Sequence, residues 1–125
     1  MAIKWNRYRY FSTSDFPPAK GEPAQKLLEM LDEAREEAGV PFIITSGVRK
    51  PKKNQKAGGA DDSAHMRGLA VDISIPNSHA RYKILRGLIL VGFHRLGIYD
   101  LHIHADCDES LDPEVAWHGI SKRST

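Results

Sequence analysis

Polar and apolar residues alternate strictly along residues 100–106, and this pattern constrains the fold more than any other feature of the chain. Successive side chains of a strand point to opposite faces, so Leu101, Ile103 and Ala105 would share one face of a strand over 101–106. The other face then holds side chains that can bind a metal or move a proton: Asp100, His102, His104 and Asp106. Two histidines flanked by carboxylates are an unusual choice for a strand face that serves only solubility.

A second group of metal-binding side chains precedes this strand, because His65 and Asp72 lie seven residues apart. Residues 69–75 predict a strand whose odd positions face the core and whose even positions, Asp72 among them, face the other way. Neutral imidazole and carboxylate suit zinc, and three protein ligands leave a fourth position open for a reactive water. Taken singly, each residue fits a loop histidine or an exposed carboxylate, but the combination predicts a divalent-metal site.

The remaining pattern predicts two helices and two further strands. Apolar residues at spacings of three and four indicate a helix from Pro23 to Ala38, with Gly39 just past its end. Residues 42–46 and 93–99 predict strands, and Ser78 can cap a helix that runs to about Val91. Residues 49–63 predict a long loop, which compact domains seldom tolerate unless it is functional, so we expect it to border the site.

The composition is that of a single globular domain of 125 residues, 1–125, in which residues 1–22 form an N-terminal arm and loop. The chain has one cysteine, Cys107, which excludes an internal disulfide framework and a cysteine-type zinc finger. The first residues lack the apolar segment of a secretory signal, and the longest apolar stretch is too short to span a bilayer. We therefore expect cytoplasmic synthesis, no membrane insertion and a monomer.

The net charge is only +2, but five cations fall within residues 49–56. A nucleic-acid arm is one interpretation of this stretch. No aromatic residue is interleaved with the cations, so a solvated loop that faces an anionic surface is favoured and no nucleic-acid partner is expected.

Several segments together resemble the zinc D-Ala-D-Ala carboxypeptidase family, and in particular its short, phage-associated branch. They are Thr45-Ser46-Gly47-Val48-Arg49, the loop with Asn54 and Gly58-Gly59, Ser63-x-His65-x-x-Gly68-x-Ala70-x-Asp72, and the His-x-Asp that follows Gly97-Ile98-Tyr99. The opening segment from Tyr10 to Phe16 resembles that branch as well, so the resemblance extends from about residue 10 to residue 117.

The resemblance implies that Zn²⁺ is held by His65, Asp72 and His104. It also implies that His102 assists the reaction from the same strand face, and that Arg49 binds the developing oxyanion or a substrate carboxylate, as a planar two-pronged cation can. Ser63 would bind substrate or order its turn. The remaining two positions have supporting roles, Asp106 beside the metal ligands and Trp117 at the edge of the site or in the core.

The chain departs from the family at one position. Many members carry the catalytic carboxylate three residues before the last zinc histidine, and that position is Leu101 here. Asp100 is the nearest acid and becomes the expected general base. His102, Asp108 and Glu109 remain alternatives.

The resemblance implies an α+β fold: a small, mainly antiparallel sheet with two principal helices on one face and the zinc site on the other. It implies a zinc metallopeptidase that hydrolyses peptidoglycan stem peptides, as a D,D-carboxypeptidase or an endopeptidase of the phage endolysin type. Such an enzyme is made in the host cell of a phage and acts on the cell wall once released. The same motif also resembles the hedgehog signalling domain, so the alternative is a catalytically silent zinc-binding module that serves as a phage structural or partner-binding protein.

Overall fold

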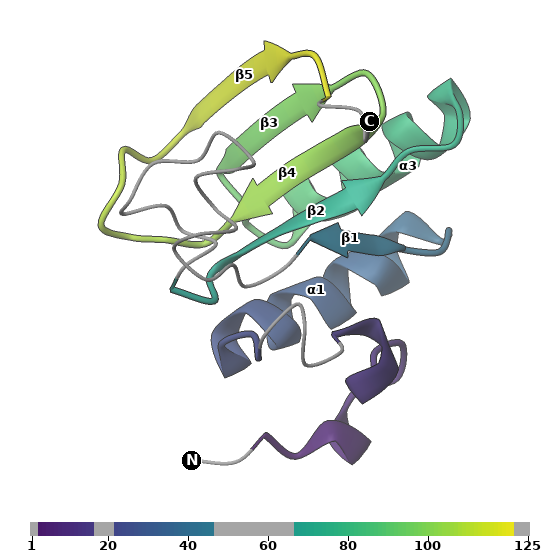
Figure 1. Cartoon of the computed structure of the whole chain (residues 1–125), viewed down its shortest axis with the longest axis vertical. Coiled ribbons are helices and arrows are strands. Elements are labelled where there is room, and N and C mark those ends of the chain that lie inside the picture. The colour runs from purple at the N-terminus through teal and green to yellow at the C-terminus, as the bar shows by residue number, and fades with distance from the viewer. Residues whose placement is uncertain (1–2, 17–21, 47–66, 122–125) are drawn as a thin grey trace.

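The computed structural model describes residues 3–16, 22–46 and 67–121, and these segments form an α+β fold with one sheet and two packed helices (Figure 1). The predicted fold class is therefore confirmed. Two short 3-10 turns open the chain, and the helices and strands follow. Their bounds are η1 Trp5–Arg7, η2 Thr13–Asp15, α1 Gln25–Ala38, β1 Ile44–Ser46, β2 Ala70–Ser74, α3 Ser78–Leu90, β3 Arg95–Tyr99, β4 His102–Asp106 and β5 Val115–Gly119.

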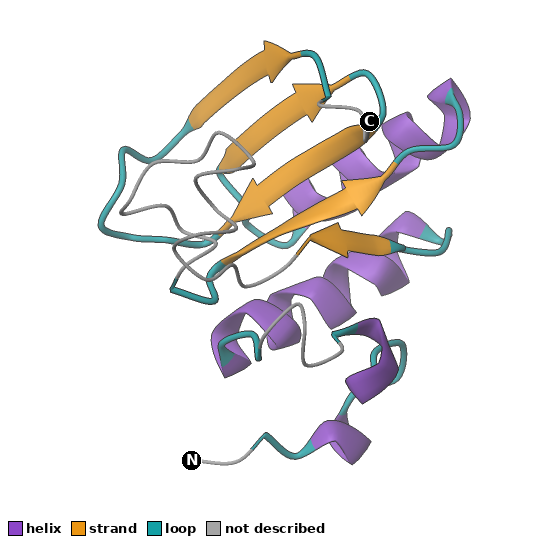
Figure 2. Ribbon diagram, in the orientation of Figure 1, coloured by secondary structure: helices purple, strands orange, loops and turns teal. Residues whose placement is uncertain are grey.

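The strands of the described sheet lie in the order β1-β2-β4-β3-β5, so β2 and β4 are flanked on both sides (Figure 2). β1, β2, β4 and β3 pair antiparallel in turn, whereas β5 runs parallel to β3. The sequence pattern did not predict β5. The predicted strand 101–106 begins one residue late, at His102, because Asp100 and Leu101 form the turn from β3.

Both helices lie close to their predicted positions. Gly39 ends α1 in the left-handed conformation, with φ 70°, which confirms the predicted glycine stop. The cap of α3 differs from the prediction: Asn77, and not Ser78, accepts the N–H of Ala80 at 2.8 Å. The described residues contain no helix long and apolar enough to cross a membrane.

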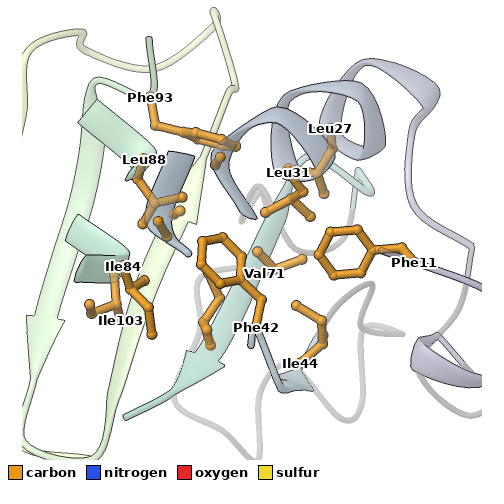
Figure 3. Packing of buried hydrophobic residues seen from close by; sticks show 14 of the residues in the cluster. Phe11, Leu27, Leu31, Phe42, Ile44, Val71, Ile84, Leu88, Phe93 and Ile103 are labelled. Atoms are coloured by element: carbon orange, nitrogen blue, oxygen red, sulfur yellow. The ribbon is translucent and has the colours of Figure 1, made fainter. Parts of the chain in front are cut away.

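The apolar face of the sheet and the two helices enclose the core. Val71 of β2 and Ile103 of β4 are fully buried there, as the odd-position pattern predicts. Figure 3 shows how side chains from both helices and from the N-terminal arm gather around them, including Leu31, Leu88 and Phe11. The core therefore occupies one face of β2 and β4, and the other face remains for the polar residues.

Candidate metal centre

Asp72 and His104 are direct neighbours across the β2–β4 pair, on the face opposite the core. Oδ1 of Asp72 lies 3.4 Å from Nδ1 of His104. Both side chains are largely shielded, with 9% and 14% of their surfaces exposed. The alternation of the two strands thus brings together two of the three predicted ligands from positions 32 residues apart in the sequence.

Asp106 fixes the other side of the His104 ring. Nε2 of His104 lies 2.7 Å from Oδ2 of Asp106, whose side chain is 1% exposed. The second carboxylate oxygen accepts the Nε–H of Arg95 at 2.9 Å and the backbone N–H of Asp108 at 3.2 Å. A histidine that binds a metal through one nitrogen usually donates the other N–H to such a carboxylate, which sets its tautomer and orientation.

The protonation of His104 depends on these two carboxylates. Burial is the largest single influence and lowers the pKa of His104, but the hydrogen bonds and charges of Asp106 and Asp72 outweigh it and raise the pKa above its ordinary value. A metal ligand must be neutral imidazole, so zinc competes with this proton and its binding releases it.

The donor set fits zinc. Two ligand atoms at zinc bond lengths in a tetrahedral site are about 3.3 Å apart, close to the observed 3.4 Å between Asp72 and His104. Within the described residues, no group of three histidine, cysteine or acidic side chains is placed to hold a metal ion. The third predicted ligand, His65, lies outside those residues, as do Ser63 and Arg49.

His102 lies on the same face as His104, with its Nε2 3.9 Å from Oδ1 of Asp72. Its ring stacks on Tyr99, with centroids 4.3 Å apart and planes 10° apart. Its Nδ1 lies 2.6 Å from Oγ of Ser121, a buried residue just after β5. The ring is therefore held on two sides while its Nε2 faces the predicted ligands.

Asp100 lies in the β3–β4 turn, where its position does not follow from the alternation of β4. Its Oδ1 accepts the backbone N–H of Ser121 at 2.6 Å, and its carbonyl oxygen accepts a hydrogen bond from Arg81 at 3.3 Å. The first of these bonds ties the carboxylate to the segment that also holds His102. Its role as general base stays a prediction.

The two alternative acids lie at the other end of β4. Asp108 is nearly buried, and its carboxylate accepts hydrogen bonds from Arg67 at 2.6 Å and from the Ser110 backbone at 3.0 Å. Burial raises the pKa of Asp108, but hydrogen bonds from the hydroxyl and the backbone of Ser110 and from Arg67 outweigh it and lower the pKa below its ordinary value. Glu109 is exposed and pairs with Lys26 at 2.8 Å.

Trp117 of β5 borders the site. Its ring centroid lies 5.3 Å from that of His104, and its Nε1–H donates to the hydroxyl of Tyr99 at 2.9 Å. This close packing requires a glycine at position 97, because a Cβ there would lie 2.6 Å from Nε1 of Trp117. Of its two predicted roles, edge of the site or core, the structure supports the first.

Three residues of this surrounding layer were missed by sequence reasoning: Arg95, Tyr99 and Ser121. Arg95 and Tyr99 lie on β3, whose apolar pattern gave no sign of chemistry, although strand alternation would have placed both beside Gly97 on the polar face. Ser121 carries no motif or periodic signal that could have identified it.

The comparison with family models matches peptidase M15 over residues 6–108. The match includes Asp72, His102, His104 and Asp106, and it ends before β5 and Ser121. The comparison with curated proteins finds no match. Since the matched span covers most of the chain, this protein belongs to the peptidase M15 family, a family of zinc-dependent metallopeptidases.

Proposed function

We propose that this protein hydrolyses a peptide bond in peptidoglycan stem peptides, next to a D-amino acid, as a D,D-carboxypeptidase or endopeptidase. The observation that carries the proposal is the pair Asp72 and His104, 3.4 Å apart, with Asp106 behind the histidine. Family membership supports a hydrolase of this kind, and the donor set suits a catalytic zinc with an open position.

The residues of the site have distinct tasks in this proposal. Asp72, His104 and His65 would hold Zn²⁺. The metal would polarise the carbonyl of the scissile bond and lower the pKa of a bound water. Asp106 accepts a hydrogen bond from Nε2 of His104, and this bond keeps Nδ1 of the same ring directed at Asp72. His102 faces the same space and would contact the carbonyl of the scissile bond. Arg49 and Ser63 would bind the substrate, and Asp100 would act as the base.

We further propose that the enzyme serves as a phage endolysin, made in the host cell and acting on the wall after release. The rival function, a silent zinc-binding module, is favoured by one observation. The usual carboxylate position is Leu101, and the neighbouring carboxylate of Asp100 accepts a backbone N–H from Ser121. Activity on a wall peptide separates the two.

The test uses the purified full chain, loaded with zinc, on a stem peptide that ends in D-Ala-D-Ala and on purified cell walls. We expect release of D-Ala or loss of wall turbidity that a chelator abolishes and added zinc restores. Tight zinc binding without hydrolysis of either substrate would refute the peptidase and support the silent module.

Variants then assign the ligands. Asp72→Ala and His104→Ala should each lose bound zinc, because a three-ligand site rarely survives with two. His102→Ala should retain zinc and lose turnover. His79→Ala is the matched control, since His79 is exposed on α3, a helix that packs on the core side of the sheet. Metal analysis of each purified variant reads the outcome, and normal zinc content in the His104→Ala protein would remove that residue from the site.

A further inference from the structure

Ser121 connects the C-terminal segment to two of the candidate catalytic residues, Asp100 and His102. Its backbone N–H donates to Oδ1 of Asp100 at 2.6 Å. Its Oγ accepts the backbone N–H of Leu101 at 3.1 Å and lies 2.6 Å from Nδ1 of His102. The residue is only 7% exposed, so water competes little for these bonds. Three contacts from one serine therefore define the geometry of the β3–β4 turn and of the His102 ring.

The donors and acceptors around this hydroxyl determine where its proton goes. A serine oxygen has one O–H to donate and two lone pairs to accept with. The N–H of Leu101 uses one lone pair. In the described part of the chain, the acceptor within reach of the Ser121 O–H is Nδ1 of His102. A hydroxyl that donates to Nδ1 leaves the proton of a neutral His102 on Nε2.

The nitrogen that carries the proton in this arrangement is the one that faces the site. Nε2 of His102 lies 3.9 Å from Oδ1 of Asp72, on the face shared with His104. Stacking on Tyr99 opposes rotation of the ring away from this orientation, and Tyr99 itself is held by the N–H of Trp117. An N–H donor is thereby fixed beside the predicted metal ligands.

We propose that Ser121 is a positioning residue that selects the Nε2–H tautomer of His102, so that His102 donates a hydrogen bond to the substrate carbonyl and does not act as the base. The role toward substrate rests on the proposed peptidase function, whereas the tautomer does not. No proton leaves the ring in this role: its N–H binds the carbonyl oxygen as negative charge develops there. A donor already aimed at that oxygen costs no reorganisation during the reaction.

The tautomer is read directly by long-range ¹H–¹⁵N NMR on the full chain with ¹⁵N-labelled histidine, at a pH where the rings are neutral. The chain has six histidines, so His102→Gln identifies the signals of His102. We expect Nδ1 as an unprotonated nitrogen and Nε2 as an N–H in the wild-type protein. A proton on Nδ1 in the wild type would overturn the proposal without any variant.

Two substitutions test whether Ser121 is the cause. Ser121→Ala removes the donor and should release the tautomer preference, whereas Ser121→Thr keeps a hydroxyl and should retain it. Ser110→Ala is the control, because that serine bonds the carboxylate of Asp108. An unchanged tautomer in the folded Ser121→Ala protein would overturn the assignment, and an Ala variant that fails to fold leaves the wild-type and Thr spectra to decide.

Turnover then tests the role toward substrate. Ser121→Ala should lower kcat roughly tenfold or more with little change in KM, as for other residues that orient a functional group from behind, and Ser121→Thr should recover most of it. If the wild-type protein has no peptidase activity while its His102 shows the expected tautomer, the proposed function fails and the role of Ser121 in setting the tautomer stands. Equal kcat in the wild-type and Ser121→Ala proteins would refute the role toward substrate.

Discussion

Replacing Asp106 with asparagine should weaken zinc binding although Asp106 is not a predicted ligand. Three donors converge on its carboxylate: Nε2–H of His104, Nε–H of Arg95 and the backbone N–H of Asp108. Asparagine has one acceptor oxygen and an amide group that donates. If that oxygen keeps Arg95 and Asp108, the amide faces Nε2 of His104 and needs an acceptor there. The His104 proton must then move to Nδ1, the atom that faces Asp72.

The magnitude follows from this tautomer change. Loss of the partner that orients a ligating histidine typically lowers metal affinity about 10- to 100-fold, which corresponds to about 1.4 to 2.8 kcal/mol. The zinc-free protein should lose stability too, because Arg95 is left beside a neutral group. Removing one member of a buried ion pair lowers the free energy of unfolding by up to about 3–5 kcal/mol. The loss in Asp106→Asn should be smaller, because the amide oxygen of asparagine can still accept a hydrogen bond from Arg95.

The assay is a zinc titration against a chromogenic chelator, with unfolding followed separately so that affinity is compared between folded proteins. Asp112→Asn is the matched control: its side chain is exposed, and only its backbone carbonyl bonds Arg95. NMR of the zinc-free Asp106→Asn protein should place the His104 proton on Nδ1. Zinc affinity equal to wild type in a folded Asp106→Asn protein would refute the reasoning.

Three further predictions concern other parts of the chain. Asp100→Asn keeps an acceptor for the N–H of Ser121, so the fold and the zinc content should persist. If Asp100 is the general base, kcat should fall about 10²-fold or more. A near-normal kcat would show that another residue is the base. Gly87→Ala should lower the free energy of unfolding by about 1–3 kcal/mol in chemical denaturation, because its Cβ would lie 2.5 Å from the backbone oxygen of Ala34; wild-type stability would contradict this packing. Burial raises the pKa of Cys107 to about 11, so the alkylation rate of the folded protein should be low at neutral pH and increase until about pH 11. A rate that reaches its plateau below pH 9 would contradict this raised pKa.

The central part of the fold was predictable because strand alternation is a local property. Val71 and Ile103 face the core and Asp72 and His104 face away, as a period of two requires. The same rule could not place Asp100, since β4 begins only at His102 and Asp100 lies in the turn before it.

The rest of the site depends on contacts between distant segments. β5 joins the sheet parallel to β3, and no hairpin signal precedes such a pairing. Ser121 lies beside His102 only because it follows β5, so the sequence near either residue does not predict their contact. The N-terminal cap of α3 was also hard to predict. Asn77 and Ser78 are both favourable N-cap residues, so N-cap propensity does not distinguish between the two neighbours.

The His102-x-His104 spacing of β4 allows a second register against β2 that strand alternation alone does not exclude. A slip of two residues against β2 keeps every side chain on its own face and places His102, instead of His104, opposite Asp72. Two backbone bonds beyond the strand ends oppose that slip: Cys107 N–H to Leu69 O at 3.0 Å and Ile75 N–H to Leu101 O at 2.9 Å. Zinc present while the chain refolds would stabilise either histidine opposite Asp72, so we expect the order of refolding and metal addition to change how much correctly paired protein is recovered.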